Sequence, residues 1–159
     1  MHPYRFTISL RITHPYLSLE QILKDIGGTP KFGWSVGEPW RTPKGALLLG
    51  GMREETYYCR WIQDWVVGDV EESISQHVEA LAPHVSLFNS YADEGGTVEF
   101  FIGLILTSNA GFEISPSVSR QLAKMRISLA FDLYSENVFV HGEKARHGAP
   151  AKPEQAELG

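Results

Sequence analysis

The chain has 159 residues, of which 43% are hydrophobic and 21% are charged, and its formal net charge at pH 7 is −5. A chain of this length typically buries about 70% of its unfolded surface, which is enough for one domain with a substantial core. The acidic balance gives no general attraction to nucleic acid or to an anionic membrane, so we expect neither as a partner. No stretch of the sequence is long and apolar enough to span a bilayer.

The single cysteine, Cys59, excludes an internal disulfide and favours a reducing compartment. The first residues, MHPYRFTISLRI, alternate apolar with polar side chains and have no continuous apolar core. This pattern is typical of a strand and not of a signal peptide. We therefore expect a cytoplasmic protein.

Residues 4–13 alternate cleanly and predict a half-buried strand that ends at His14-Pro15. A helix follows, because Ser18 and Gln21 form a capping box and Gly27 stands where a helix ends. Its apolar stripe is made of Leu19, Ile22, Leu23 and Ile26.

Two further helices are predicted by the same criteria. Asp69 is an N-cap, and the helix after it ends at Pro83, with a short helical piece expected in residues 85–91. Ser115-Pro116 opens the next helix, with serine as the cap and proline in the first turn. Their buried stripes are Val70, Ile74, Val78 and Leu81, and then Val118, Leu122 and Met125.

Residues 97–107, TVEFFIGLILT, predict the central strand of a sheet, because one face is wholly apolar and the other is apolar only in its middle. Residues 56–62 and 127–134 predict two more strands, and residues 46–49 and 138–140 predict short ones. In the strand at 127–134 we expect four inward side chains, namely Ile127, Leu129, Phe131 and Leu133.

These elements predict an α+β fold, with one mostly antiparallel sheet and helices packed on one face. The domain is expected to span residues 1–141. Residues 142–159 lack large apolar residues apart from Leu158 and are rich in Lys, Glu, Ala and Pro. Such a composition predicts a disordered tail.

The irregular region 31–52 is long for a compact domain and holds two tryptophans, so it is the first candidate for a ligand site. Trp34 and Trp40 offer rigid faces for stacking, and Glu38 and Arg41 are suited to fixing a polar ligand. We expect one indole, Trp34, to be buried and the other, Trp40, to be partly exposed beside the largest concavity. The alternative is that both indoles only cover the edge of the core.

The polar face of the sheet is the second candidate. Arg11 and Asp132 are its candidate ligand-binding residues. The alternative is a solvated face with cross-strand ion pairs of little energetic weight. The side chains expected to share it are Arg5, Arg11, Glu99, Phe101, Asp132 and Tyr134, with Tyr58 and Arg60 as possible additions.

No signature of metal, phosphate or cofactor binding is present. The histidines show no HxxxH spacing and the chain has no CxxC, so we expect no metal and no cofactor. His77 lies near the apolar stripe of its helix and is expected to be a packed histidine. Cys59 is expected on the inner face of its strand as a buried, inert thiol. No catalytic residue is identified.

Several segments together resemble a family of small, mostly bacterial domains of unknown function. They are SLRI at residues 9–12, the capped helix LSLEQILKDIGGTP at residues 17–30, the region of Gly37, Trp61, and FDLY at residues 131–134. The likeness covers roughly residues 4–140. It implies an α+β fold, and it brings no activity and no functional residues.

The leading prediction for function is a cytoplasmic binding or protein-interaction module, with an immunity-type role as one form of it. A small-molecule enzyme with its site beneath the loop between Trp34 and Trp40 is the second prediction. A structural homodimer is the third. An enzyme requires a concave pocket with converging titratable groups, whereas a binding module requires only a flat, partly aromatic patch.

Overall fold

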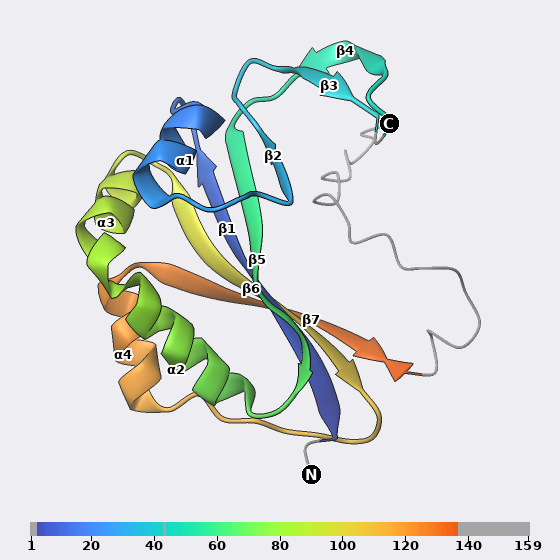
Figure 1. Ribbon diagram of the computed structural model, residues 1–159, viewed down its shortest axis with the longest axis vertical. Helices are drawn as coiled ribbons and strands as arrows, with labels where there is room; N and C mark the ends of the chain where they lie inside the picture. The colour runs from blue at the N-terminus through green and yellow to red at the C-terminus, as the bar shows by residue number, and fades with distance from the viewer. Residues whose placement is uncertain (1–2, 43, 137–159) are drawn as a thin grey trace, which may run out of the picture.

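The computed structural model describes residues 3–42 and 44–136, and it shows an α+β domain (Figure 1). Its strands are β1 (Tyr4–His14), β2 (Phe32–Trp34), β3 (Pro39–Arg41), β4 (Leu47–Met52), β5 (Thr56–Val67), β6 (Thr97–Leu106) and β7 (Ile127–Ser135). Its helices are α1 (Leu19–Ile26), α2 (Val70–Leu81), α3 (Val85–Asp93) and α4 (Pro116–Lys124), with the 3₁₀ turn η1 (Ala82–His84) between α2 and α3.

The main sheet has five strands in the order β2-β5-β1-β6-β7. All neighbours are antiparallel except β6 and β7, which are parallel and are joined through α4. The mostly antiparallel sheet is confirmed. The prediction that residues 97–107 form the central strand is wrong, because β1 is central and β6 is its neighbour. The apolar face of β6 indicates that helices cover it, but it does not indicate how many strands lie beyond β6 in the sheet.

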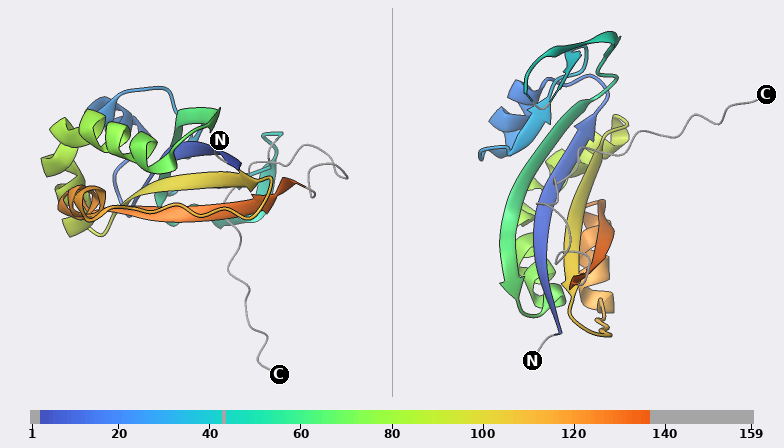
Figure 2. Two further views of the ribbon diagram at one scale, coloured as in Figure 1. Left: turned by 90° about the horizontal axis from the view of Figure 1, so that it is seen from below. Right: turned by 90° about the vertical axis from the view of Figure 1, so that its right-hand side faces the viewer.

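The helices all lie on one face of the sheet, which confirms the predicted layering (Figure 2). Every second side chain of β1 and β6 points into the layer between sheet and helices. None of the described helices lies over the opposite face of the sheet, and we call it the helix-free face. The fully buried side chains of the core include Phe6, Ile8, Leu10 and Ile12 of β1, Phe100, Ile102 and Leu104 of β6, and Ile22, Ile74 and Phe88 of the helices.

Polar side chains begin three of the helices where the sequence predicted. The hydroxyl oxygens of Ser18 and Ser115 accept the amide N–H three residues on, at 3.1 and 3.4 Å. The carboxylate of Asp69 accepts the N–H groups two and three residues on, at 2.8 and 3.2 Å. The side chain of Gln21 donates to Asp25 at 2.8 Å, so only the serine half of the expected capping box forms.

Residues 31–52 are more ordered than expected. They contain the edge strand β2 and a two-stranded arm, which we define as β3, β4 and their connection, residues 39–52. The arm projects from one end of the sheet, away from the helices (Figure 1). The expected strand at 46–49 corresponds to β4, whereas β2 and β3 were not predicted. The strand expected at 56–62 continues to Val67.

The second half of β7 differs from its prediction. Ile127 is buried, but Phe131 and Leu133 are 38% and 59% exposed, because β7 is an edge strand with a neighbour on one side only. Phe112 lies against Phe131, with ring centroids 5.2 Å apart. The predicted strand at 138–140 and the predicted tail at 142–159 lie outside the described residues.

Candidate functional site

The helix-free face collects aromatic, charged and small polar side chains. Directly opposite residues of antiparallel strands share a face, so the registers of β1 with β5 and β6 assign each side chain. Two register shifts between β1 and β5 leave Trp65 on this face. The face is formed by Arg5, Thr7, Ser9 and Arg11 of β1, by Tyr57, Cys59, Trp61 and Trp65 of β5, by Glu99, Phe101, Gly103 and Ile105 of β6, and by Asp132 and Tyr134 of β7.

This assignment confirms that six residues predicted for the polar face lie on it. It also corrects the predicted faces of three other residues, namely Tyr58, Arg60 and Cys59. Tyr58 and Arg60 pair with Ile12 and Leu10, so they point to the helix side. Cys59 lies opposite Arg11 and faces away from the helices, so its predicted inner position is wrong, although it is 3% exposed. The alternation of residues 56–62 was read correctly, but the sequence does not say which face the helices cover.

Positively charged side chains lie over aromatic rings on and beside this face. Such contacts shield the ring from water and hold the cation in place. The charged carbon of Arg11 is 3.4 Å from the ring centroid of Phe101, the amine of Lys31 is 3.0 Å from that of Trp61, and the charged carbon of Arg5 is 5.8 Å from that of Trp65. The face is therefore mixed, with apolar rings and fixed charges side by side.

Arg11 and Asp132, the two candidates on this face, have separate local partners. A nitrogen of Arg11 is 3.9 Å from a carboxylate oxygen of Glu99. Asp132 accepts a hydrogen bond from the hydroxyl of Tyr134. Burial first, and then this bond to Asp132, raises the pKa of Tyr134 to about 12, so the hydroxyl stays protonated and donates at neutral pH. Asp132 lies beside Gly103, whereas Arg11 lies beside Glu99.

The two loop tryptophans bind the same cation, which sequence reasoning missed. The charged carbon of Arg53 is 3.8 Å from the ring centroid of Trp34 and 4.6 Å from that of Trp40. Trp34 in turn stacks on Tyr57, with centroids 4.7 Å apart and ring planes at 25°. Trp40, Arg53, Trp34 and Tyr57 thus form one continuous stack between the arm and the sheet. We call these four residues the Arg53 stack.

The other two loop candidates, Glu38 and Arg41, make their hydrogen bonds in or next to the arm. The carbonyl of Glu38 accepts the backbone N–H of Arg53 at 2.8 Å, and its side chain is exposed. A guanidinium nitrogen of Arg41 donates to the carbonyl of Gly45 at 3.1 Å. The structure therefore brings Trp34 and Trp40 together through Arg53, and it keeps Glu38 and Arg41 apart from Arg11 and Asp132.

Two concavities lie away from the tryptophans. One, of about 220 Å³, lies between α2 and α4 and is lined by Val78, Gln121 and Met125 among others. The second, of about 320 Å³, lies at the ends of β6 and β7 and is lined by Leu106, Leu133 and Tyr134 among others. Trp40 is 36% exposed, as expected for the outer indole, but it lines neither concavity.

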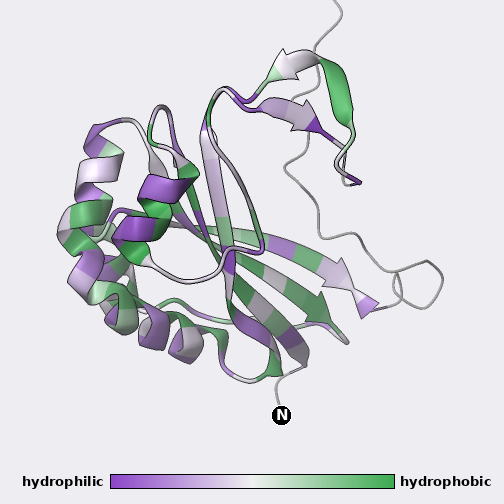
Figure 3. Ribbon diagram, turned by 45° about the horizontal axis from the view of Figure 1, so that its top comes forward, coloured by the Kyte–Doolittle hydropathy of each residue, from purple (hydrophilic) through white to green (hydrophobic). Residues whose placement is uncertain are grey.

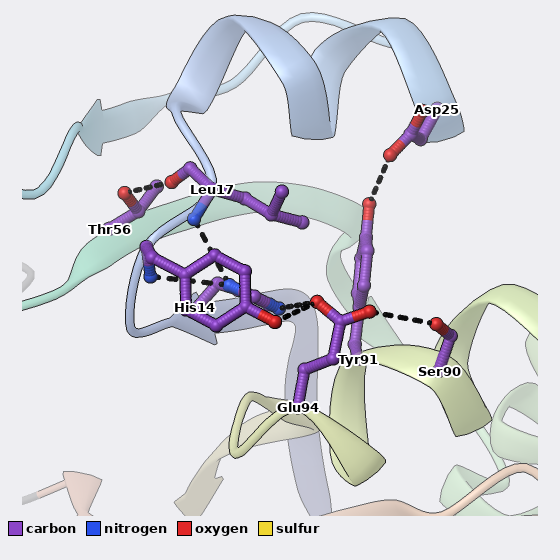
Figure 4. Close-up of polar contacts among 8 residues, drawn as sticks. His14, Leu17, Asp25, Thr56, Ser90, Tyr91 and Glu94 are labelled. Atoms are coloured by element: carbon purple, nitrogen blue, oxygen red, sulfur yellow. Dashed lines mark hydrogen bonds and ion pairs between the residues drawn. The ribbon is translucent and has the colours of Figure 1, made fainter.

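A polar cluster around His14, the last residue of β1, has the geometry of a structural contact between elements (Figure 4). His14 has no exposed surface, and its Nδ1 accepts the backbone N–H groups of Leu17 at 3.1 Å and Tyr16 at 3.4 Å. Its Nε2 is 3.4 Å from the Glu94 carboxylate, which also accepts the Tyr16 hydroxyl at 2.5 Å. Tyr91 donates to Asp25 nearby, at 2.8 Å.

The pKa values of His14 and of the half-buried His77 follow from their surroundings. Burial lowers the pKa of His14, and Glu94 offsets part of that effect. With Nδ1 accepting from two amides, the neutral ring has its proton on Nε2, toward Glu94. Burial and the nearby Arg60 lower the pKa of His77 as well. Both nitrogens of His14 are thus committed to contacts that fix the entry into α1 against the end of α3.

Within residues 3–42 and 44–136, no group of three or more His, Cys, Asp or Glu side chains is arranged to hold a metal ion. Among the helices described, none is long and apolar enough to cross a membrane.

Comparison with known proteins gives one match. No curated protein and no solved structure matches the chain significantly. The sequence model of a protein family described as a domain of unknown function, DUF4279, matches residues 2–136. This range includes β1 to β7, α1 to α4 and all six candidate residues, and it confirms the resemblance drawn from the sequence. The chain belongs to the DUF4279 family.

Proposed function

We propose that this domain is a binding module that captures a segment of a protein partner on its arm and on the adjoining helix-free face. The observation behind this proposal is the exposure of β4. Leu47, Leu48, Leu49 and Met52 are 61%, 46%, 104% and 67% exposed, and Figure 3 shows the apolar stretch on the projecting arm. Contiguous exposed apolar side chains are typical of interaction sites in soluble proteins.

The backbone of the arm supports the same function. Among the described strands, β4 pairs with β3 alone, so its other edge presents free N–H and C=O groups. A free strand edge is a template for adding an extended segment of another chain, while the side chains beside it give specificity. The leucines of β4 are exposed to water instead of packing in the core. Covering them with such a segment is favourable, because it removes their apolar surface from water.

The chemistry of the helix-free face favours binding over catalysis. Its polar groups are paired locally, Arg11 with Glu99 across the strands β1 and β6, and Tyr134 with Asp132 along β7. Its large rings are held by cations and by the sheet, which gives a pre-formed aromatic surface. Rigid aromatic and arginine side chains are enriched at the centres of protein interfaces.

The proposed module works in the cytoplasm, and inhibition of a partner in the manner of an immunity protein is one form that its binding takes. Support for the compartment comes from the single cysteine, Cys59, which is buried on β5 and has no second thiol to pair with. Support for the partner class comes from the net charge of −5, which disfavours nucleic acid.

The test places a photo-crosslinking amino acid at Leu49 and, as a control, at Ser119, which is exposed on α4 on the helix side. We expect one reproducible adduct from Leu49 in an extract of the source cells, competed by the unlabelled domain, and none from Ser119. The captured protein is then purified and its affinity for the domain is measured directly.

The variant pair Leu47→Ser with Leu49→Ser should weaken that affinity at least about tenfold, as loss of a central contact does. The matched control is Leu133→Ser, which removes an apolar side chain that is 59% exposed on the helix side of β7, opposite Leu104. Equal adducts from Leu49 and Ser119, or equal affinities of the two variants, would overturn the proposal. An adduct with a second copy of the chain would instead support the homodimer prediction.

A further inference from the structure

The guanidinium of Arg53 lies against two indoles, those of Trp34 and Trp40, and has no acceptor among the described residues. Its charged carbon lies 3.8 and 4.6 Å from the two ring centroids, and the N–H donors in the plane of the guanidinium are the groups that can form hydrogen bonds. Within residues 3–42 and 44–136 no side chain or carbonyl accepts from them, and the Nε atom is buried without a partner. The adjacent acids Glu54 and Glu55 are exposed and make no ion pair with it.

Two other arginines of the domain lie beside a carboxylate, which Arg53 does not among the described residues. Arg126 lies 2.5 Å from the carboxylate of Asp93, and Arg11 lies 3.9 Å from that of Glu99. Arg53 contacts two indoles, and in the described part of the chain it has no carboxylate partner. Partial removal of water from a charged donor strengthens the hydrogen bond that it makes to an anion.

The position of Arg53 is fixed before any ligand arrives. Its backbone N–H donates to the carbonyl of Glu38, and its carbonyl accepts the N–H of Gly37, both at 2.8 Å. The indole N–H of Trp40 donates to the carbonyl of Met52 at 2.9 Å, which holds the outer ring of the stack. A pre-ordered cation loses little side-chain freedom on binding.

We propose that the Arg53 stack binds the carboxylate of an Asp or Glu side chain in an extended segment of a protein partner. The planar guanidinium matches a carboxylate through two parallel N–H···O bonds, a geometry that an ammonium cannot reproduce. The partner is a polypeptide and not a small acid, because Trp40 lies on β3, and the exposed leucines of its partner strand β4 require apolar side chains beside the carboxylate. This inference rests on the proposed function and names the chemistry of its partner.

The test uses a blocked pentapeptide of alternating leucine and glutamate, Leu-Glu-Leu-Glu-Leu, and its analogue with glutamine in place of glutamate. Binding is followed by NMR of the ¹⁵N-labelled domain through the Nε–H signal of Arg53 and the indole N–H signal of Trp40. The Arg53 signal is assigned by its loss in Arg53→Lys. We expect saturable shifts of both signals with the glutamate peptide and about tenfold weaker binding of the glutamine analogue.

The protein variants give a second comparison. Arg53→Gln and Arg53→Lys should both lose the preference for glutamate, whereas Arg120→Gln, which removes an exposed arginine of α4, should retain it. Equal binding of the two peptides to the unaltered domain, or no binding of either, overturns the inference, and this comparison does not depend on the folding of any variant. Inorganic phosphate is the remaining probe, and binding of phosphate as tight as that of the glutamate peptide also overturns it.

The two proposals fail separately. If the peptides are not distinguished while the photo-crosslinker at Leu49 still captures a partner, the acidic segment is wrong and the binding module stands. If Leu49 captures nothing specific, the proposed function fails, and a glutamate preference at Arg53 then reports a carboxylate site alone.

Discussion

Trp65 of β5 lies across β1 and above Gly103 of β6, with its Cη2 atom 3.6 Å from the position that a Cβ atom on Gly103 would take. Thr7 of β1 is closer still, with its Cγ2 3.2 Å from that position. The indole therefore spans three strands, and the glycine provides the space beneath it. The small residue in the middle of β6 is explained by this contact and not by a bend in the strand.

We expect Gly103→Val to displace Trp65 and to lower the free energy of unfolding by about 1–3 kcal/mol, as overpacking does. Urea denaturation measures the loss, and red-shifted indole fluorescence reports the displacement. The control is Gly68→Ala, since no atom lies within 4 Å of the Cβ position there. Unchanged stability of Gly103→Val would mean that Trp65 is not seated over β6.

Ile102 tests the core side of the same strand. It has no exposed surface and packs in the main cluster between sheet and helices, so Ile102→Ala should cost about 2–5 kcal/mol through the cavity that it opens. Thr97→Ala, at an exposed position of β6, should cost less than about 1 kcal/mol. Chemical denaturation of both variants makes the comparison, and similar losses would contradict the assignment of faces.

The fold was predictable where local pattern and global burial agree. The alternation in β1 and β6 and the caps at Ser18, Asp69 and Ser115 each depend on neighbours in sequence, and the structure confirms them. Strand order and the side that the helices cover depend on contacts between distant segments. The face of Cys59 was therefore misread, although the alternation around it was correct.

The candidate site shows the same division. Aromatic content marked Trp34 and Trp40, but nothing in the local sequence indicated that Arg53, after β4, would lie between them. The closeness of the three residues follows from the backbone pairing of residues 37 and 38 with Arg53. A cation that lies one hairpin further along the sequence from two tryptophans is the pattern that would have predicted the position of Arg53.

The two indoles of the stack should differ in their contribution to stability. Trp34 is half-buried between Tyr57 and Arg53, so Trp34→Ala should lower the free energy of unfolding by about 2–4 kcal/mol. Trp40 is 36% exposed on the arm, and Trp40→Ala should cost about 1 kcal/mol or less. Equilibrium urea denaturation tests both, and unfolding by each substitution would show that both indoles belong to the core.

Stability should fall in mild acid because of His14. Its folded pKa is lowered, chiefly by burial, below the value of about 6.5 in the unfolded chain. Between these two pKa values the unfolded state binds more protons than the folded state, so the free energy of unfolding rises with pH there. The contribution is complete above about pH 6.5 and is lost as the pH falls from 6.5 toward the folded pKa.

The groups around His14 oppose its protonation in a specific way. A proton on Nδ1 would face the N–H groups of Leu17 and Tyr16, which now donate to it, while Glu94 favours the charged ring from the other side. Tyr91 faces the ring edge-on, with centroids 5.3 Å apart, and gives no charge. Protonation therefore breaks the contacts that begin the turn into α1.

The variant His14→Asn separates this effect from simple loss of packing, because the amide oxygen accepts the same N–H groups at the position of Nδ1 and does not titrate. We expect it to reduce the loss of stability between pH 7 and pH 5 in urea denaturation. His77, whose pKa is also lowered by burial, contributes in the same direction, so His77→Gln should reduce the loss further when the two are combined. If His14→Asn leaves the pH dependence unchanged, the ring of His14 in the unaltered domain is protonated as readily in the folded as in the unfolded chain.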